Sequence, residues 1–393
     1  MARSTYDRNY GGRTYRRRRK RRSWWFEILA AVFAAILLLC AYAGTINPSS
    51  FFPAPFLTLA YVPMLFLLIA LLVIATLFRR WTAVLTLVVA FVFTLPIFRF
   101  YVPLNSPENA PPMPADTTLQ FKVMTYNVLS FNRDDPMVGD SPSATMKLIL
   151  DNNPDVVLLQ EGIPSGLTWE DVPTIKPYIN EVNARYPYCY FGVEGLSIMS
   201  KVPFTASSIG EPRHMRSVLG FNRNQTSYLA RAYDLKMPSG KQLRLLDFRL
   251  QSYHLSFGKN PSVRISPDVK PAPLERMRRS FNLRNEDAMT LRRAIDASPD
   301  NLIVCGDMND VPSSHVYRVI RGDDLHDAWV EVGNGYAHTF NSHHLSYRID
   351  HILYRGAITA VAAQRPKGGD SDHYPLMVTF DIDVDKQAEK NDE

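Results

Sequence analysis

Short polar motifs lie beside apolar runs at several points between residues 125 and 373. The motifs are TYN at Thr125 to Asn127, QE at Gln160 and Glu161, GDMND at Gly306 to Asp310, RID at Arg348 to Asp350, and SDH at Ser371 to His373. Carboxylates, amides and an imidazole of this kind can bind a metal ion, move protons and stabilise an oxyanion. Because the motifs are far apart in the sequence, they can form one site only if a folded scaffold brings strand ends together.

Two of these motifs place polar side chains directly after apolar runs. Glu161 follows DVVLLQ, and a carboxylate at the end of a buried strand requires a salt bridge, an N-cap or a bound cation. Asp307 and Asn309 alternate with Met308 after LIVCG, so on an extended backbone both side chains would point to one side. There, one residue would accept protons or metal, and the other would donate to an oxyanion.

The motif SDHYP contains the adjacent residues Asp372 and His373. Neighbours in an extended segment point to opposite faces, so these two side chains should have different partners. A second carboxylate is then needed to orient the imidazole, and Asp350 in RIDHIL is available for this role.

The segment from Leu119 to Asp383 must position these residues, and it alternates β-rich runs with helical patterns. The runs that predict strands are FKVMTY, DVVLLQ, CYFG, LSIMS, TSYLARAYDL, QLRLLDFRL, NLIVCG, RIDHILY, ITAVAA and LMVTFDI. The helical patterns are Ala144 to Asn152, Ile175 to Arg185, Leu274 to Ala297 and Ser313 to Ile320. This many strands with few helices predicts an α+β domain, with packed sheets inside and helices outside.

Three apolar stretches near the N-terminus have the length of membrane spans, since a hydrocarbon core of about 30 Å needs about 20 helical residues. They run from Trp24 to Ala43, from Phe56 to Phe78 and from Thr82 to Phe98. Their near lack of charge and of amphipathic alternation favours membrane spans over buried soluble helices. We therefore expect residues 23–101 to form three transmembrane helices.

The cations around these stretches predict an orientation. The basic run Arg16 to Arg22, within a tail of residues 1–22, should stay in the cytoplasm, and Arg79 with Arg80 should return there. Three crossings place the C-terminal domain outside the cytoplasm; if the third stretch did not cross, the domain would be cytoplasmic.

The segments that flank the C-terminal domain have the composition of linkers and tails. Five prolines between Pro103 and Thr118 predict an extended spacer over residues 102–118 that separates the membrane part from the domain of residues 119–383. Residues 384–393 are mostly charged or polar and predict a disordered tail.

Six motifs together resemble those of the endonuclease/exonuclease/phosphatase superfamily in order and approximate spacing. They are TYN, LLQE, GLSIMSKVPF, GDMND, RIDHIL and SDHYP. The superfamily includes pancreatic deoxyribonuclease, abasic-site endonucleases, neutral sphingomyelinases and inositol polyphosphate phosphatases. The resemblance covers about Leu119 to Asp383 and implies a four-layer α/β/β/α sandwich that hydrolyses a phosphate ester with a divalent metal.

The resemblance also implies a metal site. Glu161 would be the principal ligand, Asn127 would orient metal or phosphate beside it, and Asp372 would bind the metal from the far side. Mg²⁺ (or Mn²⁺) suits this set, because magnesium takes few carboxylates, keeps several waters and neutralises charge that develops on phosphate.

The remaining motif residues would carry the catalytic roles that the resemblance implies. Asp307 would position or deprotonate the attacking water, and Asn309 would hold a phosphoryl oxygen. His373, oriented by Asp350, would act at the phosphate.

One motif departs from the family pattern. Many members carry a second active-site histidine in a strand motif Asn-x-His-Leu, whereas this chain reads DFRLQS, with Asp247 and Arg249 in place of the Asn and His. An arginine can bind phosphate with a bidentate fork, but it does not release a proton. Arg249 is therefore a candidate for phosphate binding, with a strand-surface salt bridge as the alternative, and His254 could compensate for the missing imidazole.

The motifs together predict a membrane-anchored, metal-dependent phosphoesterase. After Tyr101 the chain has 31 Lys and Arg against 36 Asp and Glu, a formal charge of −5. A lipid or small phosphoester is therefore favoured over nucleic acid, since nucleic-acid-binding proteins usually rely on cations. The alternatives are a true endonuclease or exonuclease, and a non-catalytic binding or scaffold domain that keeps the fold.

Overall fold

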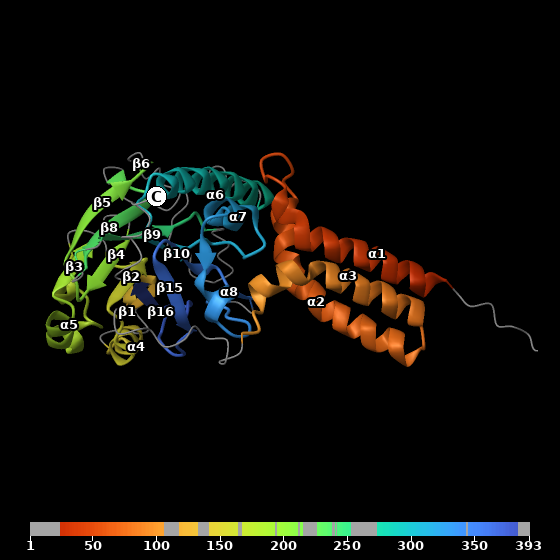
Figure 1. Ribbon diagram of the computed structural model, residues 1–393, viewed down its shortest axis with the longest axis horizontal. Helices are drawn as coiled ribbons and strands as arrows, with labels where there is room; N and C mark the ends of the chain where they lie inside the picture. The colour runs from red at the N-terminus through yellow and green to blue at the C-terminus, as the bar shows by residue number, and fades with distance from the viewer. Residues whose placement is uncertain are drawn as a thin grey trace, which may run out of the picture.

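The computed structural model describes most of the chain (Figure 1). The described residues are 24–105, 118–132, 141–163, 167–192, 195–210, 213–214, 226–237, 240, 242–252, 273–342 and 345–383. The expectations for the basic tail, for most of the proline-rich segment, for His254 and for the C-terminal tail fall outside the described residues.

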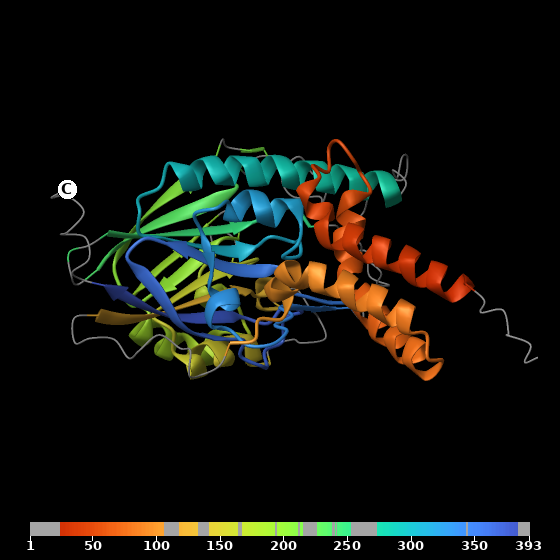
Figure 2. The ribbon, with the colours of Figure 1, turned by 45° about the vertical axis from the view of Figure 1, so that its right-hand side comes forward.

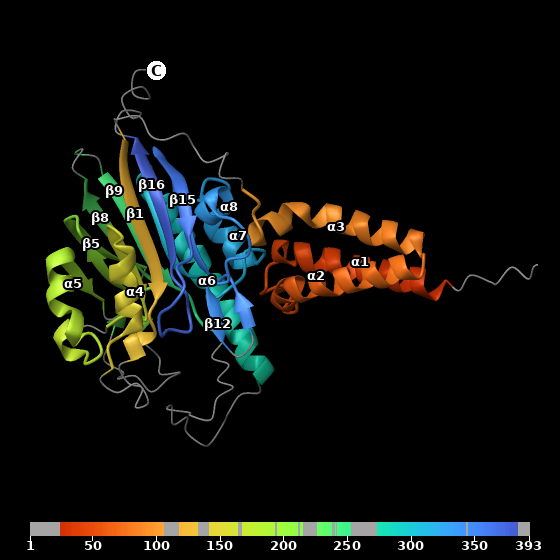
Figure 3. The ribbon, with the colours of Figure 1, turned by 90° about the horizontal axis from the view of Figure 1, so that it is seen from below.

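Three helices form an arm that projects from the rest of the molecule (Figures 1 and 3). They are α1 (Trp25–Tyr42), followed by the short 3-10 helix η1 (Ala43–Thr45), α2 (Ala54–Leu77) and α3 (Trp81–Tyr101). Each is long and apolar enough to cross a membrane. Their bounds agree with the three predicted stretches to within a few residues.

Two six-stranded sheets lie at the centre of the C-terminal domain. The first has the order β15-β16-β1-β2-β4-β3, with bounds Ile358–Gln364, Leu376–Asp383, Thr118–Asn127, Val156–Gln160, Ser197–Ser200 and Tyr188–Phe191. The second has the order β11-β14-β10-β9-β8-β5, with bounds His326–Asp327, Asp350–Arg355, Leu302–Asp307, Gln242–Arg249, Ala230–Lys236 and Phe204–Ile209. Two small hydrogen-bonded pairs complete the strands: β12 (Phe340–Ser342) with β13 (Leu345–Tyr347), and β6 (Arg213–His214) with β7 (Thr226–Ser227).

Helices cover the outer face of each sheet. The first sheet packs against α4 (Ala144–Asn152) and α5 (Ile179–Arg185), and the second against α6 (Pro273–Asp296) and α7 (His315–Arg321). The shorter helices are α8 (Ala328–Val332), η3 (Leu129–Asn132), η4 (Trp169–Asp171) and η5 (Lys176–Tyr178). With the apolar core between the sheets, this is the predicted four-layer sandwich.

The central strands explain why the apolar runs predicted the fold well. Strands β2 and β10 are buried along their whole length. Each has the opposite sheet on one face and helices on the other: β2 faces the second sheet, and β10 faces the first. A strand buried on both faces is hydrophobic at every position, so it gives a strong sequence signal. Strand β5 was not predicted, because it is a largely exposed edge strand with the small polar sequence FTASSI.

The arm packs directly against the C-terminal domain. Figure 2 shows α6 running along the domain toward the ends of α1 and α2, and the ring of Phe281 in α6 meets that of Phe56 in α2 at 5.2 Å between centroids. The hydroxyl of Tyr101 at the end of α3 is 2.6 Å from Ser313 Oγ. The three-helix arm and the domain therefore share an interface.

The first residues of the predicted spacer lie on the surface of the domain. Leu104 forms a β-bridge with Asn334, and the amide of Asn105 donates to the carbonyls of Val330 (3.1 Å) and Gly333 (2.6 Å). The chain leaves α3 and at once follows the surface of the domain, because these polar groups find backbone partners there.

Candidate active site

The ends of four parallel-paired strands meet at one edge of the sandwich. In the first sheet, Asn127 ends β1, and Glu161 directly follows β2, which is parallel to β1. In the second sheet, Arg249 ends β9 and Asp307 ends its parallel neighbour β10. The Asn127 amide donates to Glu161 Oε1 (2.9 Å) and to Asp307 Oδ2 (3.2 Å), so this side chain joins the two sheets.

A row of charged residues crosses the second sheet at the same edge. Arg249 and Asp350 are the register partners of Asp307 on either side, in β9 and β14. Arg249 Nη2 lies 2.6 Å from Glu161 Oε1, and its Nε is 4.0 Å from Asp307 Oδ2. Its side chain is about one-third exposed, and Nε itself is buried without a hydrogen-bond partner among the described residues. This arginine is therefore inside the candidate site and not on a remote strand surface.

His373 and Asp350 form the predicted pair. His373 Nδ1 is 2.9 Å from Asp350 Oδ2, and both side chains are almost fully buried. The Ser371 hydroxyl accepts from the backbone N–H of His373 and donates to the carbonyl of Asn127, which ties the SDH motif to the end of β1. Nε2 is then the ring atom left to face a substrate.

Asn309 lies beside Asp307, but not by the expected extended backbone. Strand β10 ends at Asp307, and Asn309 has a left-handed conformation (φ 49°). The turn directs its amide to Asp307 Oδ2 (3.1 Å) and to the carbonyl of Leu250 (2.9 Å). Glu161 is also left-handed (φ 48°), and such conformations in non-glycine residues are concentrated at functional sites.

The buried carboxylates shift the titration of the site. Burial alone would lower the pKa of His373, but Asp350, Asp307 and Asp372 outweigh it and raise that pKa to about 9. Burial and the charge of Asp350 raise the pKa of Asp307 to about 6. The imidazole is therefore cationic at neutral pH, and Asp307 is a stronger base than an exposed carboxylate.

The pKa values of the two expected carboxylate ligands, Glu161 and Asp372, are shifted in opposite directions. Burial would raise the pKa of Glu161, but Arg249, the Asn127 amide and His373 overcome it and lower that pKa. Burial raises the pKa of Asp372, and the nearby charge of Glu161 raises it further. The two carboxylates are therefore close enough for their negative charges to repel one another.

The donor set fits a hard divalent cation. Asp307 and Asp350 are paired on neighbouring strands, the Asn127 amide joins Glu161 to Asp307, and Asp372 interacts electrostatically with Glu161. The ligand atoms that lie within 4.8 Å of one another belong to Asp307, Asp350 and His373, and this group does not include the expected metal ligands Glu161 and Asp372. The buried Asp350 Oδ1 has no hydrogen-bond partner among the described residues. An excess of buried carboxylate oxygens is costly without a cation, and oxygen ligands are those that magnesium prefers.

Several neighbours of the site were not singled out as site residues by the sequence. The ring of Phe340 packs against His373 at 5.1 Å between centroids, and the Thr339 hydroxyl accepts from the backbone N–H of Asp350. Both lie at the start of the β12–β13 pair, whose short strands have no clear apolar pattern. Arg348 is also buried close to the site. One indication of its importance was available from the sequence, which is that it is the first residue of the RID motif.

The family assignment follows from comparison with known proteins. The sequence profile of the Endonuclease/Exonuclease/phosphatase family matches residues 124–373, which include every candidate site residue. The chain belongs to this family, and it is a phosphoesterase of the hydrolase class. A second profile, described only as a domain of unknown function, matches residues 21–100. A search of curated proteins found no match.

Several solved structures are similar to part of this chain. The human Nocturnin catalytic domain with a bound sulfate anion is 19% identical, with 66% of this chain and 93% of that chain covered and a TM-score of 0.43. An endonuclease/exonuclease/phosphatase family protein from Bacteroides thetaiotaomicron is 14% identical, with 68% and 99% covered and a TM-score of 0.44. TDP2 from D. rerio, complexed with a single-stranded DNA product, is 19% identical, with 66% and 98% covered and a TM-score of 0.41.

Proposed function

We propose that this chain is a membrane-anchored enzyme that hydrolyses a phosphate ester with the help of Mg²⁺ or Mn²⁺. The observation that carries the proposal is the convergence of Glu161 and Asn127 from one sheet with Asp307 and Arg249 from the other, beside the His373–Asp350 pair. Metal, base and phosphate-binding groups are then all within one edge of the sandwich.

Glu161, Asn127 and Asp372 would hold the metal. Bound there, a divalent cation would neutralise the charge that develops on the phosphoryl oxygens. Asn127 keeps Glu161 in place, since its amide donates to the carboxylate while its own position is fixed by Asp307.

Three side chains of the protein would transfer protons or bind the phosphate: Asp307, His373 and Asn309. Asp307 accepts a proton from the attacking water, which is favourable because its raised pKa lies near neutral pH. His373 is cationic, and its Nε2–H can donate to the phosphate while Asp350 holds Nδ1. Asn309 holds a phosphoryl oxygen, which requires its amide to leave the Leu250 carbonyl or Asp307.

Arg249 contributes a fixed positive charge where related sequences place a histidine. Its unpartnered Nε supports a role in phosphate binding, because a buried N–H donor lacks an acceptor until a ligand supplies one. It cannot replace an imidazole in proton transfer.

The substrate class favoured by charge is a lipid or small phosphoester. The region after Tyr101 has a formal charge of −5, and the membrane arm would hold the domain at a lipid surface. Nucleic acid remains the alternative substrate. By the positions of the cations, the domain would face away from the cytoplasm.

The decisive experiment is a substrate screen with the purified full-length chain. DNA, RNA, phospholipids and inositol phosphates would be tested with and without Mg²⁺ or Mn²⁺, and calorimetric titration would measure metal binding. We expect metal-dependent hydrolysis of at least one class. A scaffold that had lost catalysis would show no metal site and no hydrolysis.

Substitution of two site residues tests the assignment. Glu161→Ala and His373→Ala should each lower kcat by at least about a hundredfold, because each removes a group that acts on the transition state. Circular dichroism would confirm that each variant folds. Retained activity in both variants would refute the site.

A further inference from the structure

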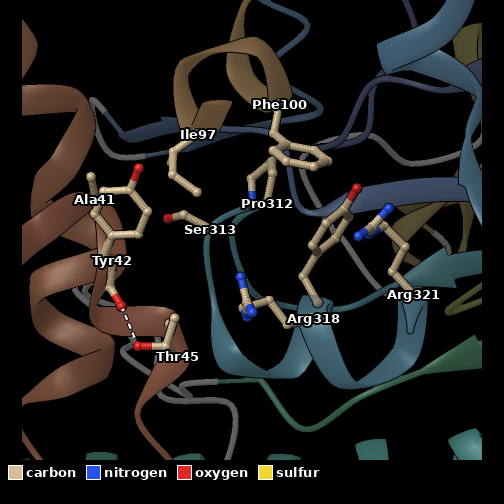
Figure 4. A pocket seen from close by; sticks show the side chains of 11 residues that line it. Ala41, Tyr42, Thr45, Ile97, Phe100, Pro312, Ser313, Arg318 and Arg321 are labelled. Carbon is tan, nitrogen blue, oxygen red and sulfur yellow. Dashed lines mark hydrogen bonds between the residues drawn. The ribbon is translucent and has the colours of Figure 1, made fainter. Parts of the chain in front are cut away.

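A small cavity lies between the membrane helices and the catalytic domain, away from the candidate active site (Figure 4). Tyr42 of α1, with Ile97 and Phe100 of α3, forms part of one wall, and Arg318 and Arg321 of α7 form another. The cavity therefore joins an apolar surface of the arm to a basic surface of the domain.

The two arginines have no carboxylate partner in the part of the chain that is described. Arg318 is exposed. Arg321 lies over the ring of Phe100, with its Cζ 5.5 Å from the ring centroid. Two unneutralised guanidinium groups on one helix face form a binding surface for an anion, and the planar guanidinium matches phosphate geometry well.

The cavity lies at the depth of lipid headgroups if the helices cross a membrane. Helix α1 has 18 residues, so it is about 27 Å long, close to the thickness of the hydrocarbon core. Its start at Trp25 and its end at Tyr42 then mark the two interfaces. The same two helices carry exposed apolar side chains, among them Leu39 of α1 and Phe93 and Leu95 of α3.

We propose that this cavity binds the headgroup of an anionic phospholipid. Arg318 and Arg321 bind the phosphate, and the acyl chains lie along the exposed apolar faces of α1 and α3. A soluble phosphate could use the same two arginines, but it would leave the adjoining apolar surface without a partner. The proposal rests on the helices spanning a membrane and not on the catalytic activity.

The simplest alternative is that the arginines only complement the dipole of α7, whose last turn they occupy. That role requires no particular lipid. The two explanations therefore differ in whether lipid identity matters at this position.

The test uses the full-length chain in nanodiscs that contain a photoreactive phosphatidylglycerol or a photoreactive phosphatidylcholine. After irradiation, mass spectrometry maps the labelled peptides. We expect phosphatidylglycerol to label the peptides around Tyr42 and Ile97 more than phosphatidylcholine does. Arg318→Gln should lower this labelling about fivefold, and adding Arg321→Gln should lower it about fivefold again, since each cation near an anionic lipid surface contributes about that factor.

Arg293→Gln is the matched control, because it removes an exposed arginine of α6 whose guanidinium donates to Thr290. It should leave the labelling unchanged. Peptides from the run Arg16 to Arg22 provide an internal reference for non-specific attraction to anionic lipid. Equal labelling by the two lipids, or full labelling in the double variant, would overturn the proposal. Displacement of the lipid by millimolar inorganic phosphate would instead identify a site for a soluble anion and would also overturn it.

Discussion

Arg249 occupies a position at which the family motif has histidine, and its guanidinium binds the carboxylate expected to hold the metal. The 2.6 Å contact places a fixed cation on Glu161 Oε1, the same oxygen that accepts from Asn127. A divalent metal must share or displace this contact. The arginine therefore has two opposing effects: it competes with metal for Glu161, and it adds positive charge for the phosphate.

Replacement of this arginine separates the two effects. Arg249→Gln should bind Mg²⁺ about tenfold more tightly, because the ion pair between Arg249 and Glu161 no longer competes with the metal. At saturating metal, kcat should fall about a hundredfold, because a phosphate-binding donor is lost. Calorimetry would measure the affinity, and steady-state kinetics the rate.

Arg244→Gln provides the control for this experiment. Arg244 lies on the same strand, but it pairs with Asp234 through two contacts of 2.7 and 2.9 Å outside the site. Its loss should leave the metal affinity unchanged. An Arg249→Gln variant with wild-type magnesium affinity would show that the ion pair does not oppose metal binding.

At the scale of elements, a buried ionic network connects α3, α7 and β14. Arg348 Nη1 contacts both carboxylate oxygens of Asp327 at 3.1 and 2.9 Å, and its Nη2 donates to the carbonyl of Phe100 in α3 at 2.8 Å. Tyr317 in α7 donates to the same carboxylate, and the buried His351 has Nδ1 3.7 Å from it. The end of α3 is thus joined to the strand that begins at Asp350.

This network predicts that acid destabilises the fold. Burial would raise the pKa of Asp327, but Arg348 outweighs it and holds that pKa well below the usual range. Burial and the Arg348 charge lower the pKa of His351. Both groups bind protons more readily when unfolded. The contribution of His351 is therefore lost below about pH 6.5, and that of Asp327 below about pH 3.9.

Thermal unfolding of the detergent-solubilised chain, measured at several pH values, tests this expectation. As the pH is lowered from 7 to 5, His351 should lower the unfolding midpoint, whereas protonation of Asp307, whose pKa is raised, should act in the opposite direction. His351 is therefore read from the difference between variants: over this range the midpoint of His351→Gln should fall less, or rise more, than that of the wild type. His326→Gln, which changes an exposed histidine outside this network, is the control variant. The same pH dependence in the His351 variant would exclude this residue as the cause.

The elements also show why some features were predictable and others were not. Strands β2 and β10 have continuous apolar sequences because both of their faces are buried, and the site motifs follow from their ends. The pairing of Arg249 with Glu161 was not predictable, since the two residues end strands in different sheets. Strand parity gives the face of a side chain, but only the packing of one sheet on the other gives its partner.

At the scale of the whole molecule, the proposed membrane insertion of the three-helix arm makes its orientation decide which compartment contains the substrate. The basic run Arg16 to Arg22 and the pair Arg79 and Arg80 predict three crossings with the N-terminus in the cytoplasm. A reporter fused after Glu393 should therefore be active only outside the cytoplasm. A reporter fused before Met1 provides the opposite control. A cytoplasmic signal from the C-terminal fusion would reject the three-crossing arrangement.

The interface between arm and domain also predicts coupling to the active site. Gly44 in η1 approaches the domain so closely that a Cβ there would lie 1.8 Å from the carbonyl oxygen of Ser313, and Ser313 follows Asp307 in the same loop. Gly44→Ala must therefore shift the loop or the arm, at a cost of about 1–3 kcal/mol. A displacement of about 1 Å at catalytic groups can lower the rate about a hundredfold, so kcat should fall although no catalytic residue is changed.

Hydrogen exchange of the loop should rise in parallel with the fall in kcat of Gly44→Ala. Ser50→Ala, at an exposed position of the α1–α2 connection, should change neither quantity. If Gly44→Ala kept both the wild-type rate and the wild-type exchange, the arm would serve only as an anchor and would not help to position the active-site loop.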